Sequence, residues 1–162
     1  MSDAKTLYDE DLVLWSEQQA EALRAAARGG TNRPIDWENV AEEIESLGIS
    51  QRSALSSQIR RIIRHFLKLE FSPATEPRRG WFESANDAKA EIDQLLEHSP
   101  SLRNELPSII AAETRRGSKL GIRDLERYGE LDPATLARVQ LRTYTEDQIL
   151  GDWFPPEPQR EE

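Results

Sequence analysis

The stretch 36–71 constrains the fold most strongly, because its apolar residues recur at the spacing of amphipathic helices. Asp36 is placed to cap a helix N-terminus. Gly48 follows the last apolar residue of the first stripe, where glycine commonly ends a helix. Ser50 can cap a second helix, whose apolar face covers 55–67. The pattern predicts an antiparallel helix hairpin with its turn at Gly48.

Further helix signals occupy the rest of the chain, and no strand-like alternation is present. Caps and apolar stripes predict helices over about 9–28, 81–98, 133–142 and 145–150, and another that begins at Pro100 with Ser99 as its cap. Pro107 should bend or break that helix near Arg103. Gly117 and Gly121 should weaken its second half, so a frayed or separate helix is expected over 114–128.

The length of 162 residues suits one domain. We expect an all-α bundle over 1–162, organised around the central hairpin, with short C-terminal helices docked on it. Trp153 and Phe154 should pack on the bundle, because large aromatic side chains are stabilised by burial. The ends, 1–7 and 157–162, are expected to be flexible.

The composition excludes several classes of functional site and disfavours some partners. The chain has no cysteine, which removes disulfides, thiolate metal sites and cysteine nucleophiles and is typical of a reducing cytoplasm. No signal peptide or membrane-spanning run is apparent. The formal charge of −9 opposes a broad nucleic-acid-binding surface. A cytoplasmic protein that does not bind membranes, and for which nucleic acid is an improbable partner, is expected.

A metal site is one candidate function. Glu42, Glu43 and Glu45 precede the turn of the hairpin and His65 follows it, and carboxylates with histidine on facing helices can ligate a metal ion. At 100° per residue, only Glu43 and His65 lie on the shoulders of their apolar faces. The two could serve a metal-dependent hydrolase or metal-binding bundle, or form a hydrogen bond across the hairpin. No cofactor and no catalytic residue are predicted.

A basic surface is the second candidate. Arg60, Arg61, Arg64 and Lys68 lie opposite the apolar face, and Arg78 and Arg79 follow in a predicted loop over 72–80. Such a surface could bind phosphate, nucleic acid or an acidic protein, or could simply be solvated. The tryptophans at 15, 37, 81 and 153 could line a ligand pocket, but their positions in the helical stripes favour packing in the core.

Several segments resemble the bacterial family catalogued as domain of unknown function 29. They are Tyr8-Asp9-Glu10-Asp11 leading to Leu14-Trp15, DWENVAEEIESLG at 36–48, HFLK at 65–68, HSPSL at 98–102, and the residues from Tyr144-Thr145 to Trp153-Phe154-Pro155. The resemblance covers nearly the whole chain and implies an all-helical domain with no established activity. The segment 115–143 departs from the family pattern.

The leading hypothesis is therefore a small, non-catalytic interaction module. Its partner, a protein or a second copy of the chain, should bind at the Arg60–Lys68 face or at the 72–80 loop. The metal-dependent protein using Glu43 and His65, and a nucleic-acid-associated protein using the basic face, are the alternatives.

Overall fold

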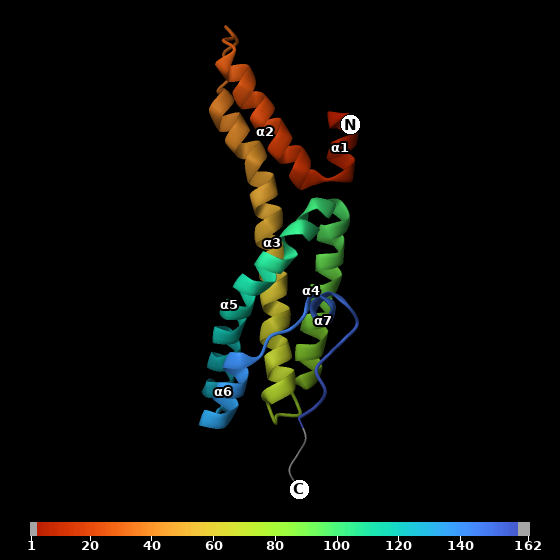
Figure 1. Cartoon of the computed structure of the whole chain (residues 1–162), viewed down its shortest axis with the longest axis vertical. Coiled ribbons are helices and arrows are strands. Elements are labelled where there is room, and N and C mark those ends of the chain that lie inside the picture. Colours follow the sequence, from red (N-terminus) through yellow and green to blue (C-terminus); the bar gives the residue numbers. More distant parts are fainter. Residues whose placement is uncertain (1–2, 159–162) are drawn as a thin grey trace. The chain divides into compact units, whose positions relative to one another are not determined.

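Helices make up most of the chain in a computed structural model that describes residues 3–158 (Figure 1). In chain order they are α1 (Ala4–Glu10), α2 (Leu12–Arg28), α3 (Trp37–Phe71), α4 (Arg78–His98), the 3-10 helix η1 (Pro100–Glu105), α5 (Leu106–Arg127), α6 (Pro133–Leu141) and α7 (Glu146–Leu150). No strand occurs among residues 3–158. The all-α fold class is thus confirmed.

The chain divides into two compact units. The first unit comprises Met1–Leu55 and Gln94–Glu105, and the second comprises Ser56–Asp93 and Leu106–Glu162. Helix α3 contributes its first part to the first unit and the remainder to the second.

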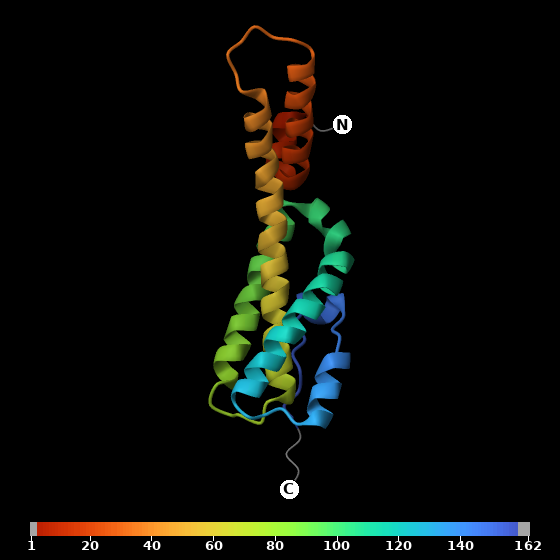
Figure 2. The ribbon, with the colours of Figure 1, turned by 90° about the vertical axis from the view of Figure 1, so that its left-hand side faces the viewer.

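The predicted hairpin at Gly48 is wrong, because α3 continues through that glycine as one helix over Trp37–Phe71. A glycine inside a helix costs only about 1 kcal/mol relative to alanine, so packing can override it. Here close packing favours it: a Cβ atom at Gly48 would lie 2.7 Å from Oγ of Ser16, a buried residue on α2. The helix hairpin of the first unit lies one element earlier, where α2 and the start of α3 run antiparallel around residues 29–36 (Figure 2).

The helix predicted over 9–28 is broken at Asp11, which adopts an extended conformation between α1 and α2. Its carboxylate is nearly buried and accepts hydrogen bonds from the N–H of Leu14, as an N-cap, and from the N–H and hydroxyl of Ser101. Three bonds to one carboxylate stabilise the break and connect α2 to η1.

The structure describes part of each chain end that the sequence predicts to be flexible. Residues 4–7 are helical and Leu7 is 8% exposed, so this part of the predicted flexible 1–7 segment belongs to the fold. Residues 1–2 and 159–162 lie outside the described residues, and 157–158 belong to no regular element.

In the second unit, α4 and α5 flank the second part of α3 (Figures 1 and 2). The frayed helix expected over 114–128 is instead the second half of α5, which is continuous. Pro107 lies in the first turn of α5, where its missing N–H is tolerated, and the change from 3-10 to α-helical geometry falls between Glu105 and Leu106, close to the break predicted near Arg103.

Gly117 and Gly121 lie where α5 meets α3. A Cβ atom at Gly117 would lie 2.8 Å from Cγ2 of Ile63, and one at Gly121 would lie 2.9 Å from Cδ1 of Leu67. Both partner side chains are fully buried. The glycines therefore allow the two helices to approach closely.

The C-terminal elements confirm the predictions from capping residues. Asp132 accepts the N–H of Thr135 at the start of α6, with Pro133 at the first helical position, and Thr145 and Gln148 form a capping box on α7. Trp153 and Phe154 dock on the bundle as expected, with both rings edge-on to the buried ring of Phe66.

Lys89 fixes α7 and the residue after it. Its ammonium group, on α4, donates to the carbonyl oxygens of Gln148, Ile149 and Gly151 at 2.6–2.9 Å. Burial lowers the pKa of Lys89 to about 8, so the group remains an ammonium ion at pH 7. Carbonyl groups at a helix C-terminus attract such a cation.

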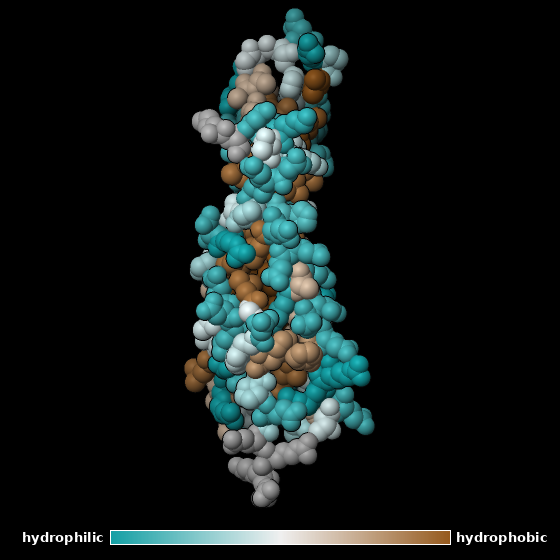
Figure 3. Space-filling model, turned by 90° about the vertical axis from the view of Figure 1, so that its right-hand side faces the viewer, coloured by the Kyte–Doolittle hydropathy of each residue, from teal (hydrophilic) through white to brown (hydrophobic). Residues whose placement is uncertain are grey.

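The surface is largely hydrophilic on the face in Figure 3, where hydrophobic side chains appear as separate patches. Within residues 3–158, no helix combines the length and the hydropathy that a membrane span requires.

Candidate functional site

Three of the six predicted basic residues lie together on α3. Arg60, Arg61 and Arg64 line one side of a shallow cavity of about 190 Å³, together with His65 and with Leu120 of α5. Arg61 is exposed and has no ion pair within the described part of the chain. These three arginines of the predicted basic face therefore lie close together in the folded chain.

The other three predicted cations lie elsewhere. Arg78 donates to the carbonyl oxygens of Leu69 and Ser72 and so holds the end of α3 against the start of α4. Arg79 is exposed and pairs with Glu83 one turn later. Both residues belong to α4, so the predicted 72–80 loop is shorter than expected. Lys68 is only 8% exposed and is not part of the outer face.

Three arginines of α5 extend the cluster. Arg116, Arg123 and Arg127 recur at intervals of seven and four residues, so they lie on one side of α5. Arg116 shares the carboxylate of Glu113 with Arg60 of α3, at 2.5 Å and 2.6 Å respectively. This shared contact places Arg60 and Arg116 side by side, and Arg64 and Arg127 line one cavity farther along the two helices. We call the six residues the arginine band: Arg60, Arg61, Arg64, Arg116, Arg123 and Arg127.

Two carboxylates in the seam between α3 and α5 hold the band together. Glu113 is 1% exposed and forms ion pairs with Arg60 of α3 and Arg116 of α5. Asp124 accepts two hydrogen bonds from Arg64, at 2.6 Å and 2.7 Å. Burial opposes the charge on Asp124, but the hydrogen bonds from Arg64 and the charge of Lys68 prevail and lower its pKa.

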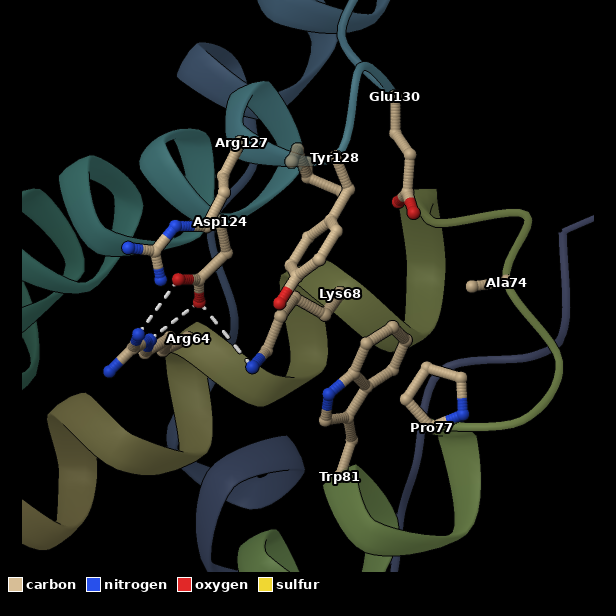
Figure 4. A pocket seen from close by; sticks show the side chains of 10 residues that line it. Arg64, Lys68, Ala74, Pro77, Trp81, Asp124, Arg127, Tyr128 and Glu130 are labelled. Carbon is tan, nitrogen blue, oxygen red and sulfur yellow. Dashed lines mark hydrogen bonds and ion pairs between the residues drawn. The ribbon is translucent and has the colours of Figure 1, made fainter.

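The α5 half of the band was not predicted from the sequence. The spacing of the three arginines contains this signal, but the glycines in 114–128 favour a frayed helix, in which no face is fixed. In Figure 4 the Arg127 side chain of α5 lies near Asp124, whose hydrogen bonds come from Arg64 of α3.

A larger cavity lies next to the band. Its volume is about 480 Å³, and we call it the Trp81 pocket. It is lined by Arg64, Lys68, Ala74, Pro77, Trp81, Asp124, Leu125, Arg127, Tyr128 and Glu130. The Nζ atom of Lys68 lies 5.1 Å from the ring centroid of Trp81 and 3.4 Å from Asp124 (Figure 4). Of the four tryptophans, Trp81 therefore lines a cavity, contrary to the expectation that all four serve the core.

The predicted metal pair is not brought together. Glu43 and His65 lie on the same continuous helix, about six turns apart, because the hairpin that would have made them neighbours does not exist. Among residues 3–158, no group of three or more histidine, aspartate or glutamate side chains has the geometry to hold a metal ion. Burial, followed by the charges of Lys68 and Arg64, lowers the pKa of His65 to about 4, so it is neutral at pH 7.

Comparison with known proteins identifies relatives but no activity. Among curated proteins, no sequence matches this chain. A solved structure, described as an alpha-helical protein of unknown function from Rhodospirillum rubrum, is similar with a TM-score of 0.69 and 25% sequence identity, over 90% of this chain and 89% of that one. The family described as "Domain of unknown function DUF29" matches residues 7–154, including the segment 115–143. The chain therefore belongs to the DUF29 family, whose function is unknown.

Proposed function

We propose that the protein is a non-catalytic interaction module and that the arginine band is its contact surface for an acidic protein partner. One observation carries the proposal: six arginines from two helices gather on one side of a protein whose formal net charge is −9. Segregation of positive charge on an acidic protein favours association with negatively charged partners and raises the rate of encounter.

The balance of ion pairs supports the same proposal. Within the described residues, Glu113 and Asp124 are the only carboxylates that pair with members of the band. Arg61, Arg123 and Arg127 have no such carboxylate among residues 3–158, and all three side chains are exposed. Exposed guanidinium groups can bind carboxylates with two parallel hydrogen bonds, which suits recognition of aspartate- or glutamate-rich segments. The proposal includes a cytoplasmic location, which the lack of cysteine supports.

The test compares partners captured from native-host extract by the wild-type protein and by the double variant Arg61→Glu, Arg123→Glu. Neither arginine has an ion pair within the described part of the chain, so the variant should fold normally. The control is Arg33→Glu, Arg103→Glu, which makes the same change of charge at exposed positions of the first unit. We expect a partner that binds the wild type and the control, is lost with the double variant, and is released by moderate salt.

Nuclease treatment distinguishes the alternative partner. A partner that survives digestion of nucleic acid supports the proposal, whereas loss of all binding on digestion would favour the nucleic-acid alternative. An identical set of partners for the wild type and the double variant would remove the band as the contact surface.

A further inference from the structure

The Trp81 pocket contains a buried cation whose hydrogen-bonding capacity is mostly unused. Lys68 is 8% exposed, yet within the described residues its ammonium group has one carboxylate partner, Asp124, at 3.4 Å. An ammonium group has three N–H donors. Asp124 is also engaged by Arg64 through two shorter bonds. At least two donors of Lys68 therefore remain available to a group that enters the cavity.

The walls of the cavity divide into a polar side and an apolar side (Figure 4). Arg64, Lys68, Asp124 and Arg127 lie together on one side, and the rings of Trp81 and Pro77 lie on the other. The ring of Tyr128 stands over the space between them, and the residue is 72% exposed. A volume of about 480 Å³ is within the range of small-molecule sites.

The charges favour an anion over a cation. The lining has three cations and two carboxylates, and Glu130 is at the opposite side of the cavity from the Lys68 ammonium group (Figure 4). A cationic ligand would have to displace Lys68 from Trp81, whose ring that ammonium group already approaches at 5.1 Å. An anion would instead satisfy donors of Lys68 and Arg127 that have no partner among residues 3–158.

We propose that the Trp81 pocket binds a small aromatic anion, with its carboxylate or phosphate group on Lys68 and Arg127 and its ring between Trp81 and Tyr128. This site shares Arg64 and Arg127 with the arginine band, but its ligand and its pocket are different from those of the contact surface, and it stands if the proposal for the acidic protein fails. It requires only the side chains of the second unit. Tyr128, which follows α5 and precedes Gly129 with a φ of +67°, is placed to cover the ligand.

The test is a titration followed by NMR, using the indole N–H signal of Trp81, assigned with Trp81→Phe. The probes are benzoate, phenyl phosphate, inorganic phosphate and benzylammonium. We expect saturable shifts with benzoate or phenyl phosphate, weaker binding of inorganic phosphate, and no saturable shift with benzylammonium. The tighter of the two aromatic anions identifies the anionic group.

Two variants test the assigned cations. Lys68→Met keeps the apolar stem and leaves Asp124 paired with Arg64, and it should weaken binding by about tenfold or more because hydrogen bonds to a charged group are lost. The exposed Arg127→Gln should weaken binding without affecting folding. Arg79→Gln, an exposed cation outside the pocket, should bind as the wild type does.

The double variant used for the arginine band distinguishes the two proposals. Arg61→Glu, Arg123→Glu should leave the titration unchanged, since neither residue lines the pocket. The proposal is overturned if neither aromatic anion shifts the Trp81 signal, if benzylammonium binds as well, or if Arg127→Gln and Lys68→Met both bind normally. Equal affinity for inorganic phosphate and phenyl phosphate would overturn the role of the rings.

Discussion

Substitution of Gly117 by alanine tests whether the glycines of α5 serve close helix packing. The new Cβ atom would lie 2.8 Å from Cγ2 and 3.0 Å from Cβ of Ile63, and 3.4 Å from the carbonyl oxygen of Arg60. The Ile63 side chain is 1% exposed and cannot turn away into solvent. The backbones of α3 and α5 must therefore move apart.

The magnitude results from two opposed effects. Alanine in a helix interior is favoured over glycine by about 0.8–1.0 kcal/mol. Overpacking of a well-filled core costs about 1–3 kcal/mol, and contacts below 3.0 Å place Gly117 toward the upper part of that range. We expect a net loss of about 1–2 kcal/mol in the free energy of unfolding. For a chain of this size, each kcal/mol lowers the melting temperature by roughly 2–4 °C.

Gly80→Ala is the matched control. Gly80 lies in α4, and a Cβ atom there would meet no other atom within 4 Å. The same chemical change should thus leave stability unchanged or raise it by up to about 1 kcal/mol. Urea unfolding followed by far-ultraviolet circular dichroism measures both variants. A Gly117→Ala protein as stable as Gly80→Ala would refute the role of close packing at that position.

Three further predictions concern capping, buried charge and pH. Lys89→Met removes three hydrogen bonds to carbonyl oxygens around the end of α7 and should lower the free energy of unfolding by about 2–4 kcal/mol, measured by urea denaturation. Asp132→Ala removes the N-cap of α6 and should lower the melting temperature, with Asp132→Asn restoring most of it. Because the pKa of His65 is about 4 in the folded protein and 6.5 when unfolded, its contribution to stability is complete above pH 6.5 and is lost as the pH falls toward 4. His65→Gln should therefore flatten the pH dependence of the melting temperature in that interval, and an unchanged slope would contradict the shift.

The interpretation of glycine separates the correct predictions from the wrong ones. Asp132, Pro133 and Thr145 were interpreted correctly, because capping depends on residues within one turn of the helix end. Gly48 and Gly117 were interpreted wrongly, as residues that end or weaken a helix. A glycine satisfies the need to end a helix and the need to bring two helices close together equally well, and the difference depends on a neighbour far away in the sequence.

The candidate sites also divide into features that one helix reveals and features that depend on the helix beside it. Arg60, Arg61 and Arg64 could be recognised from α3 alone because they share one face of a helix. The partner arginines on α5, and the enclosure of Lys68 by Trp81 and Asp124, required knowledge of which helix lies beside α3. Glu43 and His65 were joined only by a hairpin that does not form.

Sequence by itself determined that this chain is helical, where its short C-terminal helices begin, and that Trp153 and Phe154 pack inward. Tertiary structure decided that α3 is continuous, that two glycines of α5 lie against it, and that a pocket opens between Trp81 and Tyr128. The physical reason is that the apolar period of a helix defines which of its faces is buried but carries no information about which element covers that face.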